Sequence, residues 1–427
     1  MRKRSVSIVA TLLVCAAIGF GQSALQVFDQ AKQDFDAKRF QSAATGFARY
    51  TQLVPTDPAG FTNLGLSYYF LDRYSESIPA FSTATRLKSD SYTAWVYLGI
   101  CYEKSSRYSD AVNALKTAAG IEPNNPFAHA QLGLVYYGGK NYADAERSLR
   151  RAVELKPGDY FYRYRLSLTL YYLERFDQAM AEARESIRLK PDYSYSRALL
   201  GDIFYNNKQF KEAVVEYKEA VRLRPTDPAT HYQLGQSYYG LKNYVAAIAA
   251  FKEAVRLDPA DYDGWVYLGN SLDYNNQLNE AIEAYKAGLK LRPDSAMAYS
   301  ELGIAYNRAG NFIEAEKYSR EAIKREPGRQ KYHTDQCMNL RRLKRFTEAL
   351  AECQEAVRID SKYVEGYYEL GTLYRDMRDQ ANSEKKTVAA RGFDQKAKEQ
   401  VTKLETLDPE EAQKLNDLIT PAVKPKP

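Results

Sequence analysis

Apolar and small residues recur along this chain at an interval of 34 residues. Positions within a repeat are numbered so that Trp95 stands at position 4. The repeat containing it carries the set Trp95, Leu98, Gly99, Tyr102, Ala111, Leu115, Ala118 and Pro123. A step of 34 residues gives His129, Leu132, Gly133, Tyr136, Ala145, Leu149, Ala152 and Pro157. The register holds from about residue 24 to about residue 376 without an insertion or deletion.

This spacing predicts two helices in each repeat. Positions 4, 7, 8 and 11 fall on one stripe of a first helix, because residues three and four apart share a helix face. Positions 20, 24 and 27 form a matching stripe on a second helix. Proline at position 32 ends the second helix or opens the next turn, because proline cannot continue a helix. One helix pair cannot bury its apolar stripe alone, so stability is expected to accumulate by stacking of neighbouring pairs.

The pattern resembles the tetratricopeptide repeat family, which places an aromatic residue, Leu-Gly, Tyr, Ala, Phe, Ala and Pro at these offsets. The resemblance implies an all-α fold, a right-handed superhelical α-solenoid of about 10–11 tandem helix hairpins with a C-terminal capping helix. Three repeats depart from it: the first repeat lacks the Leu-Gly pair, and the fifth and tenth carry Leu166-Ser167 and Gln336-Cys337 in its place.

Four regions are expected along the chain. Residues 25–378 form the solenoid, and residues 379–420 form charged C-terminal capping helices. The last of these helices is expected to begin at Asp408-Pro409, with the aspartate as its cap and proline at the first helical position. Residues 421–427 are expected to be a disordered tail, and residues 1–24 have a different character from the rest.

Residues 1–24 have the composition of a secretory signal peptide. Arg2, Lys3 and Arg4 precede an apolar run from Val6 to Phe20, which is followed by small residues. The run is shorter than the roughly 20 residues that a membrane-spanning helix needs, so cleavage is favoured over an N-terminal membrane anchor. We therefore expect an exported protein that is periplasmic, outer-membrane-associated or secreted, with peripheral membrane association as a further option.

Charge and motifs argue against nucleic-acid binding and catalysis. Removal of residues 1–24 lowers the net charge from +6 to +3, which leaves no basic field of the kind nucleic-acid binders show. His129, His231 and His333 are spaced by three repeats each, so they lie too far apart to share a metal. No catalytic or phosphate-binding motif occurs, and no long stretch lies outside the repeats. We expect neither an enzyme nor a cofactor.

Two cysteines of the tenth repeat are a candidate disulfide. Cys337 replaces the glycine at position 8, and Cys353 stands at position 24, which carries a large residue in most repeats. In the family these two positions face one another across the helix pair. In an oxidising compartment, a disulfide would stabilise this repeat, which matches the family consensus poorly. The alternative is two buried thiols that act as small hydrophobic side chains.

A partner would bind to a surface that the repeat core leaves open. The resemblance implies an inner groove lined by the first helices, on a face that positions 2, 5, 9 and 12 share. Position 12 carries tyrosine in five of the six repeats from the second to the seventh, then polar and finally basic residues. The alternative is that these tyrosines pack against the next helix. The candidate ligand-binding residues are Tyr69, Phe127, Tyr137, Phe161, Tyr171, Tyr195, Tyr205, Tyr239, Asn270, Arg341 and Arg375.

The first hypothesis is a non-enzymatic scaffold that holds a protein or an extended peptide in this tyrosine-lined groove, because tyrosine offers a rigid apolar area with a polar tip. The arginines would favour acidic groups at one end. The second hypothesis is a glycan-binding scaffold in polysaccharide or envelope assembly, and a third is a non-catalytic subunit of a glycosyltransferase system. Self-association through exposed tyrosines is a further option.

Overall fold

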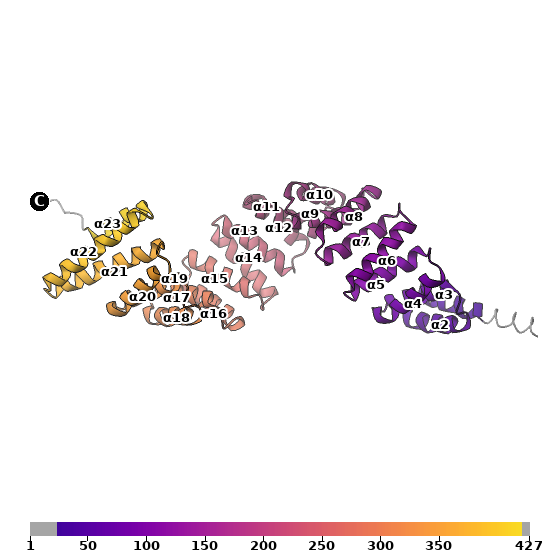
Figure 1. Ribbon diagram of the computed structural model, residues 1–427, viewed down its shortest axis with the longest axis horizontal. Helices are drawn as coiled ribbons and strands as arrows, with labels where there is room; N and C mark the ends of the chain where they lie inside the picture. The colour runs from indigo at the N-terminus through magenta and orange to yellow at the C-terminus, as the bar shows by residue number, and fades with distance from the viewer. Residues whose placement is uncertain (1–23, 421–427) are drawn as a thin grey trace, which may run out of the picture. The chain divides into compact units, whose positions relative to one another are not determined.

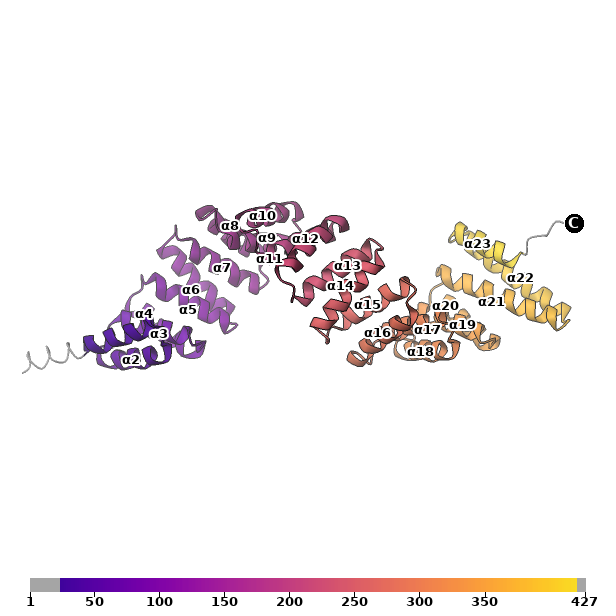
Figure 2. The same cartoon turned by 180° about the vertical axis from the view of Figure 1, so that it is seen from behind.

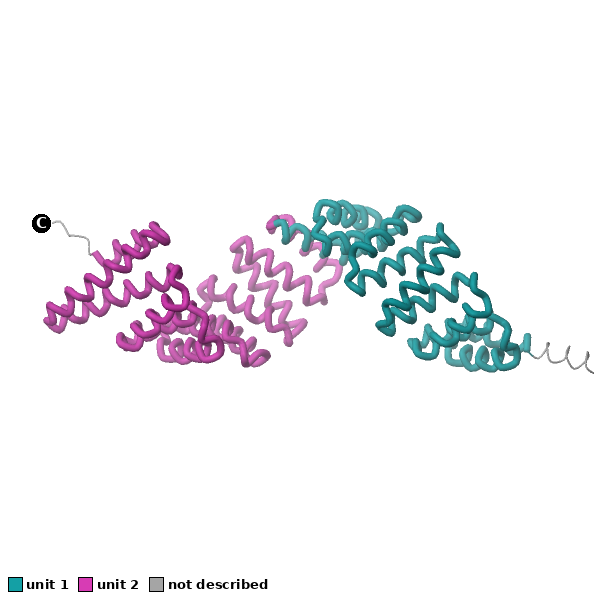
Figure 3. The backbone as a smooth tube through the Cα atoms, in the orientation of Figure 1, with its two compact units in different colours: residues 1–207 teal, residues 208–427 magenta. Residues whose placement is uncertain are grey.

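The computed structural model describes residues 24–420, and every regular element in this range is an α-helix (Figure 1). The chain divides into two compact units, residues 1–207 and residues 208–427 (Figure 3). Each unit is a stack of consecutive helix hairpins, in which every helix packs mainly on its chain neighbours. The expected all-α repeat fold is confirmed.

In the first unit, helical residues 24–36 are followed by ten helices. Their bounds are α2 Phe40–Leu53, α3 Pro58–Tyr69, α4 Tyr74–Leu87, α5 Tyr92–Lys104, α6 Tyr108–Ile121, α7 Pro126–Gly138, α8 Tyr142–Leu155, α9 Tyr160–Tyr172, α10 Phe176–Leu189 and α11 Ser194–Asn206. The odd-numbered helices are the first helices of the repeats, and the even-numbered helices are the second helices.

The second unit begins with a second helix, and its last two helices, α22 and α23, lie outside the regular repeat pattern. The bounds are α12 Phe210–Leu223, α13 Pro228–Gly240, α14 Tyr244–Leu257, α15 Tyr262–Tyr274, α16 Leu278–Leu291, α17 Ala296–Arg308, α18 Phe312–Arg325, α19 Gln330–Arg342, α20 Phe346–Ile359, α21 Val364–Ser383, α22 Thr387–Glu405 and α23 Pro409–Ile419.

A left-handed residue at position 15 closes the turn inside each hairpin. In the third repeat Ser106 has a φ of 59°, and the N–H of Arg107 donates to the carbonyl of Tyr102 at 2.8 Å. This bond satisfies a carbonyl that the end of the first helix leaves free. Nine hairpins use a residue other than glycine there, and one uses Gly310.

The hairpin core depends on a glycine at position 8 that faces a large side chain at position 24. An added Cβ on Gly133 would lie 2.6 Å from Cγ of Leu149, and one on Gly269 would lie 2.6 Å from Cε1 of Tyr285. Both large side chains are almost fully buried. The absence of a side chain at position 8 therefore lets the two helices of a hairpin approach closely.

Extra helices follow the repeats at the C-terminal end. α21 continues through residue 378, so the expected boundary between solenoid and cap falls inside this helix, which then pairs with the long α22 (Figure 1). Leu415 of α23 is fully buried and lies close to Gly371. Asp408 caps α23 by accepting hydrogen bonds from the backbone N–H groups of Glu410 and Glu411.

The predictions of a signal peptide and of a tail concern residues that lie outside the described range, apart from residue 24. Between residues 24 and 420, no helix combines the length and the apolar character that crossing a membrane requires.

Candidate interaction surface

Positions 2, 5, 9 and 12 of the first helices form the candidate surface, and the structure places their side chains in different settings. At position 2, Phe127 is 36 % exposed and Tyr195 is 45 % exposed, whereas Phe161 is half-buried. The tyrosines at position 12 are half-buried as well. Near the C-terminal end, the polar and basic members of the set engage other side chains of the protein.

Two position-12 tyrosines belong to aromatic triads, each formed by rings at position 12, position 17 and position 13 of the next repeat. The ring of Tyr137 lies 5.6 Å from that of Tyr142 and 5.7 Å from that of Tyr172. Tyr142 and Tyr172 stack at 5.1 Å with an interplanar angle of 11°. The second unit repeats this arrangement with Tyr239, Tyr244 and Tyr274. The outermost ring of each triad is the position-13 ring, 49 % exposed in Tyr172 and 59 % in Tyr274.

The remaining position-12 tyrosines also contact their neighbours. The ring of Tyr69 lies 5.0 Å from that of Tyr97 in the next repeat. The hydroxyl of Tyr171 accepts a hydrogen bond from Nδ2 of Asn206 at 2.7 Å, and Tyr205 is half-buried. Tyr69 and Tyr171 thus pack against the following repeat, and a part of each of these three side chains stays accessible to solvent.

Four rings gather on the first-helix face of α9 and α11, and we call Phe161, Tyr164, Tyr193 and Tyr195 the aromatic patch. The ring of Tyr193 lies 5.3 Å from those of Tyr164 and Tyr195. The ring of Phe161 lies 6.4 Å from that of Tyr164. Burial, followed by the neighbouring tyrosines, raises the pKa of Tyr193 to about 12, so its hydroxyl stays protonated near neutral pH. The patch therefore offers apolar ring surface and neutral hydroxyl groups.

Arg165 connects the aromatic patch to the first triad. Its guanidinium lies 4.9 Å from the ring centroid of Tyr137 and 5.9 Å from that of Phe161. Arg165, Tyr164 and Tyr193 are not among the residues predicted from the sequence. Tyr164 follows Phe161 by three residues and thus shares its helix face. Tyr193 stands in the loop before α11, where no helix periodicity signals its direction.

The arginines at the C-terminal end are held in ion pairs. The side chain of Arg341 is 9 % exposed, and its two terminal nitrogens lie 3.2 Å from Glu369 and 2.9 Å from Asp376. Arg375 also pairs with Asp376, at 2.5 Å. Carboxylates of the chain itself therefore already neutralise the groups that were expected to attract an acidic partner. Asn270 is likewise engaged, because its Oδ1 accepts a hydrogen bond from the hydroxyl of Tyr285 at 2.7 Å.

The same first-helix face is hollowed and acidic at the end of the second unit. A cavity of about 750 Å³ lies between α19, α21 and the start of α23. Its lining includes six carboxylates and two lysines, together with the rings of two tyrosines. These residues are Asp335, Asp360, Glu365, Glu369, Asp408, Glu411, Lys331, Lys362, Tyr363 and Tyr368. Burial raises the pKa of Asp335 to about 6.

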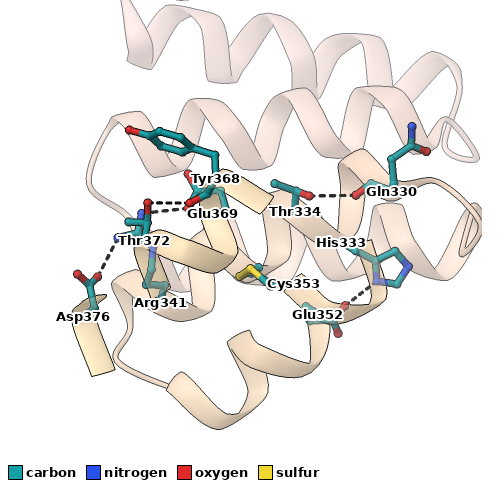
Figure 4. Close-up of a disulfide and its surroundings, with 11 residues drawn as sticks. Gln330, His333, Thr334, Arg341, Glu352, Cys353, Tyr368, Glu369, Thr372 and Asp376 are labelled. Atoms are coloured by element: carbon teal, nitrogen blue, oxygen red, sulfur yellow. Dashed lines mark hydrogen bonds and ion pairs between the residues drawn. A yellow bond between two sulfur atoms is a disulfide. The ribbon is translucent and has the colours of Figure 1, made fainter. Parts of the chain in front are cut away.

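Cys337 and Cys353 are joined by a disulfide between α19 and α20, with a Cα–Cα distance of 5.3 Å (Figure 4). Nearby, Nδ1 of His333 lies 2.6 Å from Glu352 across the same helix pair. α19 buries five polar side chains (His333, Thr334, Asp335, Gln336 and Asn339), so the disulfide lies in a repeat whose first helix is unusually polar inside.

The three histidines share one packing role at position 4. Nε2 of His129, His231 and His333 donates to the backbone carbonyl at position 32 of the preceding repeat, at 2.8–3.0 Å. The indole N–H groups of Trp95 and Trp265 make the same bond. Among residues 24–420, no group of three or more His, Cys, Asp or Glu side chains is placed to hold a metal ion.

These stacked helix hairpins define an α-solenoid repeat protein. Sequence profiles described as tetratricopeptide repeat match residues 62–126, 104–166, 162–193, 228–261 and 296–329, and a profile described as TPR repeat matches residues 201–242 and 274–310. Together they cover more than half of the chain. The chain belongs to the tetratricopeptide repeat family.

No curated protein matches the chain. Among solved structures it is similar to YrrB, described as a TPR protein with an unusual peptide-binding site, with 20 % identity over 44 % of this chain and 96 % of that one and a TM-score of 0.42. It is also similar to the C-terminal part of a TPR repeat-containing protein from Cytophaga hutchinsonii (19 % identity, 56 % and 97 %, TM-score 0.48). PilF from Pseudomonas aeruginosa is 18 % identical over 52 % of this chain and 97 % of that one, with a TM-score of 0.44.

Proposed function

We propose that this protein is a non-catalytic scaffold that binds an extended segment of a partner protein along the first-helix face of its repeats. The observation that carries the proposal is the aromatic patch of Phe161, Tyr164, Tyr193 and Tyr195. Its rings contact one another, and Tyr195 remains 45 % exposed. Partly exposed tyrosines supply large contact areas at low conformational cost, which suits the binding of a peptide.

The first-helix faces of the two units would favour different groups of a partner. The rings near Tyr164 and Tyr195 suit apolar or aromatic side chains. The acidic cavity beside Asp335 and Asp408 suits basic side chains, because the surplus of carboxylates in its lining attracts positive charge. We therefore propose a preference for basic groups in this region, in place of the preference for acidic groups that was expected from the sequence.

A peptide display experiment tests this function. Unstructured 12-residue peptides selected on the wild-type protein should bind at least about tenfold more weakly to Tyr164→Ala/Tyr195→Ala, because buried aromatic contacts dominate such interfaces. Tyr108→Ala is the matched control: this ring is 39 % exposed at the start of the second helix α6 and should leave affinity unchanged. Equal affinity of the double variant and the wild type would contradict the proposal. Retention of oligosaccharides on a glycan array, without selection of any peptide, would favour the glycan-binding alternative.

We also infer that the protein works outside the cytoplasm. The apolar run of residues 1–24 and the disulfide between Cys337 and Cys353 support this inference, because disulfides persist in oxidising compartments. N-terminal sequencing of the protein from fractionated cells should find a mature chain that lacks the apolar run, with both cysteines protected from alkylation. A full-length chain with two free thiols in the cytoplasmic fraction would contradict it.

A further inference from the structure

A second cavity lies away from the first-helix face, on the side of the second helices. It has a volume of about 860 Å³ and is formed by α14, α15 and α16, which lie side by side in both views (Figures 1 and 2). All of its lining residues belong to the second unit. The volume falls in the range of roughly 300–1,000 Å³ that is typical of ligand pockets.

The cavity lies where the eighth repeat combines three residues that no other repeat carries together. These are Leu272 at position 11, Ala284 at position 23 and Ala287 at position 26. In the next repeat, Tyr306 and Tyr318 occupy positions 11 and 23, and their rings stack at 5.4 Å with an interplanar angle of 3°. Their counterparts in the eighth repeat leave that volume empty.

The cavity has an apolar floor and a mainly basic rim. Val255, Leu268 and Leu272 are buried at its base, and the half-buried indole of Trp265 forms part of its wall. Its charged lining residues are the four cations Lys252, Arg256, Lys286 and Lys290 and the two carboxylates Glu280 and Glu283.

The rim keeps a positive surplus after its internal ion pairs are counted. Lys252 pairs with Glu280 at 2.8 Å, and Lys286 pairs with Glu283 at 2.8 Å. Arg256 pairs at 2.6 Å with Glu253, which is outside the cavity lining. Lys290 is exposed, and no ion pair joins it to a residue within 24–420. An occupant should therefore carry negative charge beside an apolar group.

The terminal segments of this chain have the wrong charge for this cavity. Residues 1–23 contain three basic residues, residues 421–427 contain Lys424 and Lys426, and neither segment has an acidic residue. We propose that the cavity is a second docking site, which takes a bulky apolar side chain of a partner protein from an acidic segment. The apolar side chain would fill the space above Leu272 and Ala284, and the carboxylates would face Lys290 and the basic rim.

Trp265 provides a direct readout of this site. The chain has two tryptophans, so Trp95→Phe leaves Trp265 as the sole indole. The probe is a synthetic peptide of three copies of Glu-Glu-Leu-Phe, and two control peptides carry Lys in place of Glu or Ser in place of Leu and Phe. In the Trp95→Phe protein, the acidic apolar peptide should change Trp265 emission saturably, and neither control should. A response to the basic peptide as strong as that to the acidic peptide, or no response to the acidic peptide, would overturn the proposal.

Two variants close the site by different means. Ala284→Tyr supplies the ring that fills this space in the next repeat, and Ala287→Glu introduces the residue that five other repeats carry at position 26. Each should weaken binding of the acidic peptide at least about tenfold. Ile313→Glu is the matched control, because this side chain is 70 % exposed on α18, and it should change affinity less than about twofold.

Ala287→Glu keeps the test decisive if Ala284→Tyr does not fold. Unchanged peptide affinity in a folded Ala287→Glu protein would overturn the proposal. Sedimentation velocity identifies the competing occupant: a dimer of the wild type that Ala287→Glu dissociates would assign the cavity to a second copy of the chain, and would overturn the assignment to an acidic partner.

Discussion

Replacing Gly235 with alanine tests the close helix contact on which each hairpin depends. An added Cβ would lie 2.7 Å from Cε1 and 2.8 Å from Cδ1 of Phe251, whereas carbon atoms prefer separations of about 3.5–4.0 Å. Phe251 is fully buried, and its ring is held by Tyr232 at 5.7 Å and Tyr267 at 5.6 Å, so it has little room to move. The ring or the helix must therefore shift by about 1 Å.

The expected cost follows from two opposing effects. Overpacking of a rigid core destabilises a protein by about 1–3 kcal/mol. Alanine inside a helix is more favourable than glycine by up to about 1 kcal/mol, which offsets part of this cost. We expect Gly235→Ala to lower the free energy of unfolding by about 1–2 kcal/mol. Urea unfolding followed by helical circular dichroism measures the total loss. Hydrogen exchange in α13 and α14 reports whether it is local, because repeat arrays need not unfold as one unit.

Two other glycines serve as matched controls. An added Cβ on Gly120 would meet no atom within 4 Å, and one on Gly288 would come no closer than 3.6 Å to any neighbour. Alanine at either site should leave stability unchanged or raise it by up to about 1 kcal/mol. Equal stability of Gly235→Ala and these two variants would show that the helices do not need a glycine at position 8.

The first repeat shows how an alanine is accommodated at position 8. Ala31 belongs to the same buried cluster as Phe47, and position 23 there is Gly46. An added Cβ on Gly46 would lie 2.7 Å from Cβ of Ala31, so volume lost at position 23 makes room at position 8. Ala250→Gly should consequently cost less in the Gly235→Ala background than in the wild type, which a double-mutant cycle measures.

Three further perturbations test other parts of the structure. Cys337→Ser/Cys353→Ser should lower the free energy of unfolding by about 3 kcal/mol, since the disulfide closes a loop with a sequence separation of 16. Reduction of the wild type should lower its stability by the same amount, which would confirm that the loss comes from the missing bond. Burial raises the pKa of Asp335 to about 6, so folding favours the protonated form of this carboxyl. As the pH falls from 7 to 4, the free energy of unfolding of the wild type should therefore rise by about 2–3 kcal/mol relative to that of Asp335→Asn. Parallel pH profiles of the two proteins would contradict this prediction. Tyr172→Ala removes a ring that stacks on Tyr142 and should cost about 1–2 kcal/mol in urea unfolding; an unchanged midpoint would show that the triad contributes no stability.

The hairpins could be predicted from the sequence because each one depends on residues close together in the chain. The neighbours that cover a position-12 ring could not be predicted in this way, because they are side chains that the repeat pattern does not specify. Tyr137 is covered by Tyr142, five residues away, and by Tyr172 in the next repeat. A search for aromatic residues at both of these offsets would have identified the triads, and it also finds Phe35, which contacts rings at the same two offsets.

The arginines at the C-terminal end were interpreted without their partners for a similar reason. Glu369 and Asp376 follow Arg341 by 28 and 35 residues, which places both in the first helix of the next repeat. Charges along a single helix therefore do not describe this surface, because side chains of neighbouring repeats meet across it. Oppositely charged residues separated by about one repeat length would have indicated these ion pairs.

Positions 8 and 24 show how one rule accounts for both the regular repeats and their exceptions. Glycine faces a large side chain in most hairpins, whereas Ser167 faces the small Ala183 and its hydroxyl donates to the carbonyl of Ala179 at 2.7 Å. In the tenth repeat, Cys353 is small enough to leave space for Cys337, and the two sulfurs fill the gap between the helices as a covalent bond. The disulfide thus occupies the volume that other hairpins fill with one large residue. It compensates for apolar contacts in the repeat whose first helix buries the most polar side chains.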